Sequence, residues 1–527
     1  MANITNDGAV YVTGRPSAGV PSGSPVAGGV ATTNDGAVYV VGLTTNDHSR
    51  PGYIQFGDSI LGNGGNPLVP AITATIGALT ATVTIAGHGQ WPGAWVLLRG
   101  AAQEEFNGWF QVSAYTSSSI FEITLTSPAT VTTATAAAAS GLRMMTQSRW
   151  NDRNVVEVAN QLAGNRLRFI ANAGLNAQTS AEILARTAAD VLNNPMGAPA
   201  LCFVCAGVND ALNGTAIATT QANLEAIYTT LRGGGVEPVA MTLPPISTAA
   251  TGYSTTVRAF YLQLNAWIRE YASAQGMKLV DLYGAWVDPT DANGNWATNY
   301  ATSDGIHPSP LAVQRLAKLY LKAQIESWAP PVTPRAVAVV DTYAVTADSR
   351  QMNHYPLLGG SGGSGAATVA TGYIVAVTGT GATTNTVPSR ADGFGSNQRM
   401  VVTSAANNDS ATLRFTAALG TTYGGQLAVG DRVRLQAVVS LTSITALSRF
   451  DLWLEFVSNG VTYFIYGQTN SAGTNWADDM ADMVIETPEF TVPPLGITAI
   501  NMQMRVQFSG AGGATVDTGR IWLGKVA

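Results

Sequence analysis

The sequence predicts a multidomain protein whose largest part is an α/β domain, with a parallel sheet covered by helices on both faces. From residue 53 to residue 328, short apolar runs typical of buried strands alternate with longer segments whose apolar residues recur every three to four positions. After residue 366 the helical spacing almost disappears and alternating strand patterns remain, which favours a separate β-sandwich. The length of 527 residues gives room for three or four domains, at roughly 100–200 residues each.

Residues 1–50 carry an internal repeat and are expected to anchor the chain to a larger assembly. The sequence TNDGAVYV occurs at residues 5–12 and again at residues 33–40, each time as a turn signal followed by a short strand pattern. The residues between the copies are rich in glycine, proline and serine and cannot form a packed core alone. Two equivalent docking elements explain the repeat, and a flexible leader is the alternative. No basic stretch followed by an apolar one opens the sequence, so no signal peptide is visible.

The α/β domain is expected over residues 51–328. Its strand-like runs are residues 53–56, 167–171, 200–206, 236–243 and 278–282. Thr179 and Glu182 have the spacing of a capping box, and residues 257–271 carry one apolar stripe typical of a helix. A last helix is expected over residues 309–327, ended by the prolines at 330–331. Its inward side chains are predicted to be Leu311, Leu316, Leu319, Tyr320 and Ile325.

Residues 70–142 interrupt the alternation of strands and helices. They are rich in threonine, alanine and valine and contain alternating strand patterns separated by turns, which predicts a small β module inserted into the α/β domain. HGQ at residues 88–90 and FNGWFQV at residues 106–112 resemble a small β module that recurs in phage tail and baseplate proteins. The insertion is expected to flank the candidate site described below and to shape access for a large substrate.

The remainder of the chain predicts a linker followed by an all-β domain. Residues 329–366 contain APPVTPR and GGSGGSG, which are typical of a linker. Residues 367–527 are expected to form a jelly-roll-like β-sandwich that binds carbohydrate or holds subunits together. Four aromatic residues there are candidates either for stacking on sugar rings or for packing in the core: Trp453, Tyr463, Tyr466 and Trp476.

Four short motifs in the α/β region combine polar residues with predicted strand ends. They are FGDSI at 56–60, NAGLNAQT at 172–179, GVND at 207–210 and DGIHP at 304–308. The first three directly follow predicted strands, and the fourth precedes the last helix. An open parallel sheet places its site at the carboxyl ends of its strands, so we expect the four motifs to meet there.

Together these motifs contain the groups that serine acyl transfer requires. Ser59 is the candidate nucleophile, because a strand-to-helix turn exposes its hydroxyl. His307 is the candidate general base, and Asp304, three residues earlier, is expected to fix the tautomer of the imidazole. The oxyanion hole is expected to consist of the Ser59 N–H, the Gly174 N–H and the Asn209 side-chain amide. The neighbouring acids at 58 and 210 are interpreted as hydrogen-bond acceptors that stabilise the loops.

Composition excludes several function classes. The formal net charge is −6 and only four lysines occur, so a nucleic-acid partner is not expected. No run of about 18 apolar residues is present, which excludes a membrane span. Cys202 and Cys205 lie three apart in a predicted buried strand, where their side chains point to opposite faces, and are interpreted as free thiols. The four histidines lie far apart and lack paired acidic ligands, so no metal site is expected.

Taken in order, the four motifs resemble those of the SGNH (GDSL-type) hydrolase family, over about residues 51–328. The serine, glycine, asparagine and histidine that give the family its name correspond to Ser59, Gly174, Asn209 and His307. The resemblance implies a flavodoxin-like α/β/α fold, no metal or organic cofactor, and hydrolysis of esters. Members of the family often remove acetyl groups from carbohydrates or cleave lipid and small acyl esters.

The sequence departs from the family pattern in three places. Ile60 stands where the first motif usually has leucine, which is a conservative change. Ala177 stands where a second glycine is common, and alanine would be strained if that position requires a positive φ. The gap of 115 residues between Ser59 and Gly174 is longer than in compact members, and the predicted insertion accounts for it.

As a whole, the chain resembles a phage tail fibre, tailspike or other receptor-binding protein. This resemblance implies a virion protein that removes acyl groups, most often O-acetyl, from host cell-surface polysaccharide. It also implies attachment to other tail or baseplate proteins through residues 1–50, and a homotrimer. Two alternatives remain open: a secreted bacterial carbohydrate esterase, and a tail adhesin or structural protein that keeps the fold without turnover.

Overall fold

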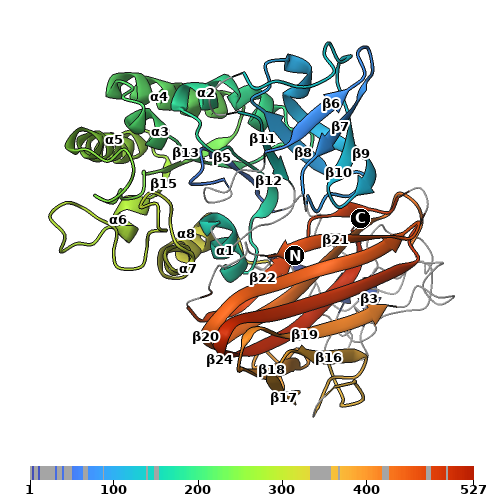
Figure 1. Ribbon diagram of the computed structural model, residues 1–527. Coiled ribbons are helices and arrows are strands. Elements are labelled where there is room, and N and C mark those ends of the chain that lie inside the picture. The colour runs from blue at the N-terminus through green and yellow to red at the C-terminus, as the bar shows by residue number, and fades with distance from the viewer. Residues whose placement is uncertain are drawn as a thin grey trace.

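The computed structural model describes most of the chain from residue 50 onward and short strands before it. The described residues are 3–4, 10–11, 30–32, 38–40, 50–62, 69–86, 88–137, 141–146, 154–332, 358–365, 368–417, 427–469, 476, 478–493 and 496–526. Three sheets form the body of the molecule: a parallel sheet, the sheet of an inserted module and a large C-terminal antiparallel sheet (Figure 1).

A five-stranded parallel sheet forms the centre of the α/β domain. Its strands lie in the spatial order β12 (Arg168–Gly174), β5 (Gly52–Gly57), β13 (Leu201–Cys205), β14 (Glu237–Met241) and β15 (Lys278–Val280). In chain order this is 2-1-3-4-5, the order of doubly wound flavodoxin-like sheets. All neighbours pair in parallel, and each predicted strand-like run overlaps one of these strands. The prediction of a parallel α/β sheet is confirmed.

Helices pack on both faces of this sheet (Figure 1). One group contains α2 (Ser180–Ala185), α3 (Val208–Leu212), α4 (Ile217–Gly233) and α5 (Thr255–Ala274), which contact one another. The other contains α1 (Val155–Leu162), α7 (Pro310–Leu316) and α8 (Lys322–Trp328). A short helix, α6 (Leu282–Trp286), follows β15. The capping box predicted for Thr179 and Glu182 is present at the start of α2.

The last helix differs from its prediction. A π-helical turn, η4 (Ala317–Leu321), separates α7 from α8. It adds a residue to the turn and rotates the following side chains relative to a continuous α-helix. Leu319 and Tyr320 are therefore 61% and 57% exposed, although the α-helical spacing predicts them inward. Leu316 and Ile325 are buried as predicted.

The segment between β5 and α1 forms a six-stranded antiparallel sheet. In spatial order its strands are β11 (Arg143–Thr146), β8 (Trp95–Arg99), β9 (Gly108–Ser117), β10 (Ile120–Thr124), β7 (Thr80–Thr84) and β6 (Ala71–Ala74). A short 3-10 helix, η2 (Glu104–Phe106), precedes β9. Phe110, Phe121 and Ile123 are buried in this module and belong to the same continuous hydrophobic core as the α/β domain. We call it the inserted module below.

Antiparallel strands make up the C-terminal domain. They are β16 (Tyr373–Thr378), β17 (Ala382–Thr386), β18 (Asn397–Ser404), β19 (Asn407–Ala417), β20 (Arg432–Ser458), β21 (Val461–Gln468), β22 (Met480–Glu486), β23 (Phe490–Thr491) and β24 (Ala499–Val526). The two long strands β20 and β24 pair with each other along most of their length and carry the others at their sides. An antiparallel all-β domain is confirmed, and its jelly-roll arrangement stays a prediction.

Part of the predicted linker is folded. In the GGSGGSG stretch, the Gly363 N–H donates to the carbonyl of Val369 at 3.1 Å. The Ser364 N–H donates to the carbonyl of Tyr373 at 2.9 Å, and the Ser364 carbonyl accepts from the Val375 N–H at 2.8 Å; both partners are on β16. These bonds satisfy backbone groups that a flexible linker leaves to water. Residues 333–357 and 366–367 lie outside the described residues.

The two N-terminal repeats lie in two short hairpins of the same kind. The strands are β1 (Asn3–Ile4) with β2 (Val10–Tyr11), and β3 (Val30–Thr32) with β4 (Val38–Val40). One TNDGA sequence lies between the two strands of each pair, and its residues, 5–9 and 33–37, are themselves outside the described residues. The rest of residues 1–49, including the segment between the copies, lies outside the described residues.

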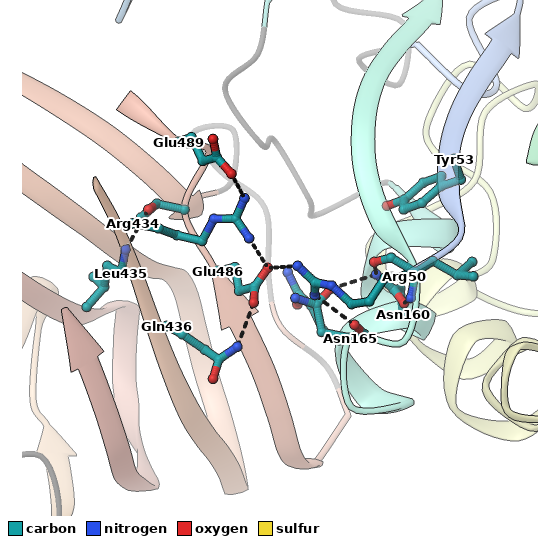
Figure 2. Close-up of polar contacts among 12 residues, drawn as sticks. Arg50, Tyr53, Asn160, Asn165, Arg434, Leu435, Gln436, Glu486 and Glu489 are labelled. Atoms are coloured by element: carbon teal, nitrogen blue, oxygen red, sulfur yellow. Dashed lines mark hydrogen bonds and ion pairs between the residues drawn. The ribbon is translucent and has the colours of Figure 1, made fainter. Parts of the chain in front are cut away.

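A buried polar cluster joins the α/β domain to the C-terminal domain (Figure 2). The carboxylate of Glu486, at the end of β22, accepts from Arg50 Nη2 at 2.9 Å, Arg434 Nη1 at 3.2 Å and Gln436 Nε2 at 2.6 Å. Arg50 lies two residues before the start of β5 and also donates to the carbonyl of Asn165 at 2.9 Å. Both arginines and Glu486 are buried, so the two domains share one desolvated network of charges.

Candidate active site

The serine of the first motif lies on the turn that follows β5, at the carboxyl end of the parallel sheet. Gly57 ends the strand with φ +156°, and a Cβ there would lie 2.0 Å from the carbonyl oxygen of Cys205 on β13. Only glycine allows this close approach of the two strands. The Gly62 N–H donates to the carbonyl of Asp58 at 3.0 Å and closes the turn that carries Ser59.

Ser59, His307 and Asp304 form a continuous hydrogen-bonded chain. His307 Nε2 lies 2.7 Å from Ser59 Oγ, and His307 Nδ1 lies 2.8 Å from Asp304 Oδ2. Ser59 and His307 are separated by 248 residues in sequence, so the fold alone brings them together. This is the geometry of a nucleophile, a base and an acid that orients the base. The structure therefore places all three predicted residues in one site.

The loop with Asp304 and His307 is held by its own backbone. Asp304 Oδ1 accepts from the N–H groups of Ile306 at 2.8 Å and His307 at 3.0 Å, and from the Thr302 hydroxyl at 2.7 Å. Partial burial acts to raise the pKa of Asp304, but the hydrogen bonds from His307, Ile306 and Thr302 outweigh it and hold this pKa well below its usual range. Asp304 is therefore ionised at neutral pH and fixes the Nδ1–H tautomer of His307.

The structure does not support the role predicted for Gly174. Its N–H donates to Oδ1 of Asn172 at 2.8 Å, so this donor is used inside the fold. A Cβ at position 174 would lie 2.6 Å from the backbone nitrogen of Gly62. The glycine is required because β12 ends against the turn of Ser59, which is a packing reason rather than access to an oxyanion.

Asn209 lies on the first turn of α3, the helix that follows β13 at the carboxyl edge of the parallel sheet. Its Nδ2 donates to the carbonyl of Gln178 at 2.9 Å. An asparagine side chain has two N–H donors, so a second one is left for a substrate. Gly207 begins this helix with φ +124°, and its Cβ position lies 2.6 Å from Leu264, which explains why glycine opens the GVND motif.

Ala177 adopts the positive φ that the family's second glycine tolerates, with φ +65°. A residue with a Cβ pays roughly 1–2 kcal/mol for this left-handed conformation. We expect Ala177→Gly to raise the free energy of unfolding by about 0.5–1 kcal/mol, since the entropy of glycine in the unfolded chain offsets part of the gain. Urea unfolding of the two proteins measures this difference, and a variant less stable than the wild type would contradict it.

The two acids beside the site have different surroundings. Asp210 accepts from the Ser180 N–H at 2.7 Å, the Ser180 hydroxyl at 2.6 Å and the Thr220 hydroxyl at 3.1 Å, which confirms that it stabilises the loops. Asp58 is fully buried; its Oδ1 accepts from the Ile60 N–H at 3.0 Å, whereas its Oδ2 has no hydrogen-bond partner among the residues that the structure describes. Desolvation by burial raises the pKa of Asp58 to about 7, against the opposing effects of that backbone bond and of His307.

Because of this raised pKa, the difference in stability between the wild type and an Asp58→Asn variant should depend on pH. Between about pH 4 and pH 7 the folded state keeps a proton on Asp58 that the unfolded state releases. The free energy of unfolding therefore falls progressively as the pH rises through this range, and the whole loss is present above pH 7. Asp58→Asn keeps an acceptor for the Ile60 N–H and removes the charge. We expect its stability advantage over the wild type to grow by a few kcal/mol from pH 4 to pH 8. Thermal unfolding over this range measures it; a pH-independent difference would contradict the buried ionisation.

The thiols of Cys202 and Cys205 take no part in the hydrogen-bonded chain of Ser59, His307 and Asp304. Cys202 and Cys205 are free and buried, as predicted. In the part of the chain that the structure describes, no group of three or more His, Cys, Asp and Glu side chains is arranged to hold a metal ion. Among the described helices, none has the length and apolar composition needed to cross a membrane.

Comparison with known proteins identifies the domain that contains this site. Residues 134–315 match the GDSL-like Lipase/Acylhydrolase family. The match contains Gly174, Asn209, Asp304 and His307 and begins after Ser59, which the inserted module separates from them in sequence. No curated protein matches the chain. The chain thus contains a GDSL-like lipase/acylhydrolase domain.

Solved structures resemble about a third of the chain. A GDSL-like lipase from Bacteroides thetaiotaomicron has 23% identity and a TM-score of 0.28, with 33% of this chain and 82% of that chain covered. The psychrotrophic esterase EstA from a Pseudoalteromonas species has 19% identity and a TM-score of 0.24, covering 33% and 85%. An acetyl xylan esterase has 15% identity and a TM-score of 0.25, covering 31% and 91%.

Proposed function

We propose that the chain is a serine esterase that hydrolyses acyl esters through a covalent intermediate on Ser59. One observation carries this proposal: Ser59 Oγ, the His307 imidazole and the Asp304 carboxylate are linked by contacts of 2.7 Å and 2.8 Å. The GDSL-like family match over residues 134–315 supports the same reaction class.

The geometry defines the role of each group in the reaction. His307 Nε2 accepts the Ser59 hydroxyl proton as Oγ attacks the ester carbonyl, and Asp304 stabilises the imidazolium that forms. The tetrahedral intermediate then collapses, and His307 returns the proton to the leaving alcohol. In the second half, a water molecule attacks the carbonyl of the acyl–Ser59 ester as His307 Nε2 takes one of its protons. His307 then returns this proton to Ser59 Oγ as the bond between Oγ and the acyl carbon breaks, which releases the acid and restores the serine hydroxyl.

For the oxyanion we propose the Ser59 N–H, the free N–H of the Asn209 amide and the Ala177 N–H. The Asn209 amide contacts the carbonyl of Gln178, the residue after Ala177, so these donors belong to one region of the site. Ala177 takes the place that the sequence predicts for Gly174, because the Gly174 N–H is already bonded to Asn172. Donors fixed in this way stabilise the charge that develops on the carbonyl oxygen.

The proposed substrate is an acylated glycan, most often O-acetylated, on a host cell surface. A face of the C-terminal domain supports this choice. Trp453 pairs with Tyr466 across β20 and β21, with ring centroids 6.0 Å apart, and Glu455 pairs with Phe464, which is 39% exposed. Glu455 also accepts from Gln503 Nε2 at 2.7 Å. The exposed ring of Phe464 and the half-buried ring of Tyr466 offer a stacking surface, and the neighbouring carboxylate and amide offer hydrogen bonds for sugar hydroxyls.

Two of the predicted sugar-stacking candidates do not belong to this face. Trp476 and Tyr463 are buried and pack against Phe450 and Phe456 respectively, with ring centroids 5.6 Å and 4.7 Å apart. Trp453 is largely buried as well, and Tyr466 is half-buried. Phe464 was not among the candidates, because alternation alone does not say which face of β21 is covered by the core.

For the biological setting we propose a phage tail receptor-binding protein located in the virion. The two matching N-terminal hairpins support attachment to other tail or baseplate proteins through residues 1–50, and trimerisation is part of the same proposal. A secreted carbohydrate esterase is the alternative setting for the same chemistry.

Acetate release from an O-acetylated polysaccharide tests the proposed substrate class. The wild type and Ser59→Ala are compared on acetylated xylan and on a chromogenic acetyl ester at equal concentration. We expect wild-type turnover of both, and loss of both in the variant. Turnover of the small ester alone would contradict the glycan substrate. Binding of the polysaccharide without turnover of either ester would favour a silent adhesin.

A further inference from the structure

A buried guanidinium, that of Arg186, contacts the end of the strand that leads into the turn carrying Ser59. We call this turn, residues 58–62, the catalytic turn. Arg186, at the end of α2, donates from Nη2 to the carbonyl of Gly57 and from Nη1 to the carbonyl of Ala173, both at 2.8 Å. Its Nε donates to Gln178 Oε1 at 2.6 Å, and its Cζ lies 4.5 Å from the ring centre of Phe56. One side chain therefore holds the ends of β5 and β12 and the loop that carries the proposed oxyanion donors.

The carboxylate of Asp190 forms an ion pair with this guanidinium. Asp190 is fully buried in the π-helical turn η3 (Ala188–Leu192), and its Oδ2 lies 3.0 Å from Arg186 Nη1. A buried carboxylate needs charged or hydrogen-bonded partners to offset its desolvation, and Arg186 supplies only part of them.

The remaining partners of Asp190 come from the inserted module. Arg99, the last residue of β8, donates from Nε to both carboxylate oxygens of Asp190, at 3.1 Å and 3.3 Å, and also contacts it through Nη2. Trp109 on β9 donates its indole N–H to the backbone carbonyl of Asp190 at 3.1 Å. Residues from β8 and β9 of the inserted module thus hold Asp190, which in turn holds Arg186.

We propose that the inserted module positions the catalytic turn through the chain Arg99–Asp190–Arg186. This inference rests on the proposed esterase function. None of the three residues touches the reacting atoms; they are positioning residues that act through the carbonyls of Gly57 and Ala173. The module is then required for turnover itself, in addition to any part it has in substrate access.

The physical reason is that a single buried carboxylate, that of Asp190, is shared between the guanidinium groups of Arg99 and Arg186. When Arg99 is removed, Asp190 loses the partner that fixes both of its oxygens and turns toward Arg186 alone. Arg186 then shifts with it, and the strand ends that precede Ser59 and Ala177 follow. Small displacements of reacting groups reduce turnover strongly while substrate binding is preserved.

Arg99→Met tests the proposal, because methionine keeps the length and apolar part of the side chain. We expect kcat on a chromogenic acetyl ester to fall about 3- to 30-fold, with KM changed less than about twofold. Arg99→Lys should recover part of the loss. The matched control is Arg166→Met: Arg166 bonds the carbonyls of Glu326 and Ala329 at 3.0 Å each, beside the start of β12 and away from Ser59. Its kcat should stay within about twofold of the wild type.

Hydrogen exchange followed by mass spectrometry gives a second readout that does not require turnover. The Leu175 N–H donates to the carbonyl of Gly57 at 2.9 Å, and the Gly62 N–H to that of Asp58 at 3.0 Å. We expect faster exchange in the peptides with these two groups in Arg99→Met, and unchanged exchange there in Arg166→Met.

The outcomes separate the inference from the function on which it rests. A folded Arg99→Met protein with wild-type kcat, or with a change in KM alone, overturns the positioning role, and so does unchanged exchange at Leu175 and Gly62. A wild type that hydrolyses no ester overturns the proposed function instead, and the exchange measurement then still decides whether Arg99 holds the turn.

Discussion

Ser59→Ala should reduce the turnover of a chromogenic acetyl ester by about 10,000-fold or more. The variant lacks the only atom that bonds to the acyl group in the proposed mechanism. Its fold should be unchanged, because among the described residues the serine hydroxyl is hydrogen-bonded to His307 alone. Initial rates at saturating ester, with protein of equal purity, measure the effect.

Two further variants give this experiment its controls. Ser327→Ala removes a hydroxyl that bonds the carbonyl of Gln324 on α8, and should keep wild-type turnover. His307→Ala should lose about as much as Ser59→Ala, and the double variant should lose no more than either, because the two residues act as a unit. A Ser59→Ala protein that keeps a tenth of the wild-type rate would place the chemistry elsewhere.

Glu486→Ala should lower the free energy of unfolding by about 3–5 kcal/mol. The substitution leaves Arg50 and Arg434 buried without the carboxylate that both contact, at 2.9 Å and 3.2 Å (Figure 2). Removing one partner of a buried charge cluster is costly because the other charges stay desolvated. Urea unfolding followed by tryptophan fluorescence measures the loss.

Glu489→Ala is the matched control for this second prediction. Glu489 also pairs with Arg434, at 2.5 Å, and with Arg432 at 3.0 Å, but its side chain is partly exposed to water. Its removal should cost about 1 kcal/mol or less. Equal losses in the two variants would show that the buried contact between the domains does not contribute more than a surface ion pair.

Much of the site could be predicted from the sequence because its chemistry lies in short motifs at strand ends. The turn after β5 and the three-residue spacing of Asp304 and His307 are local features, and parallel strands bring their carboxyl ends to one edge. The same logic placed all five strands of the central sheet. The pairing of Asp304 with His307 follows from spacing, and that of Ser59 with His307 from the sheet.

Features that depend on contacts between distant segments could not be predicted. The reason for glycine at position 174 is the backbone of Gly62, 2.6 Å from where its Cβ would lie, and this contact joins two separate segments of the chain. Leu319 and Tyr320 point outward because a π-helical turn shifts the helical register. The contacts of Arg99 with Asp190 and of Arg50 with Glu486 join residues 91 and 436 positions apart. In each case the tertiary environment, and not the local pattern, decides the partner.

The most direct test of the account is the covalent labelling of the nucleophile by a small organophosphonate ester, followed by peptide mass spectrometry. The reagent transfers its phosphonyl group to an activated serine hydroxyl and mimics the tetrahedral intermediate. We expect one adduct per chain, on the peptide that contains Ser59, with no adduct in Ser59→Ala and much slower labelling in His307→Ala. A folded wild-type protein that stays unlabelled, or that carries the adduct on another serine, would contradict the assignment of Ser59 as the nucleophile.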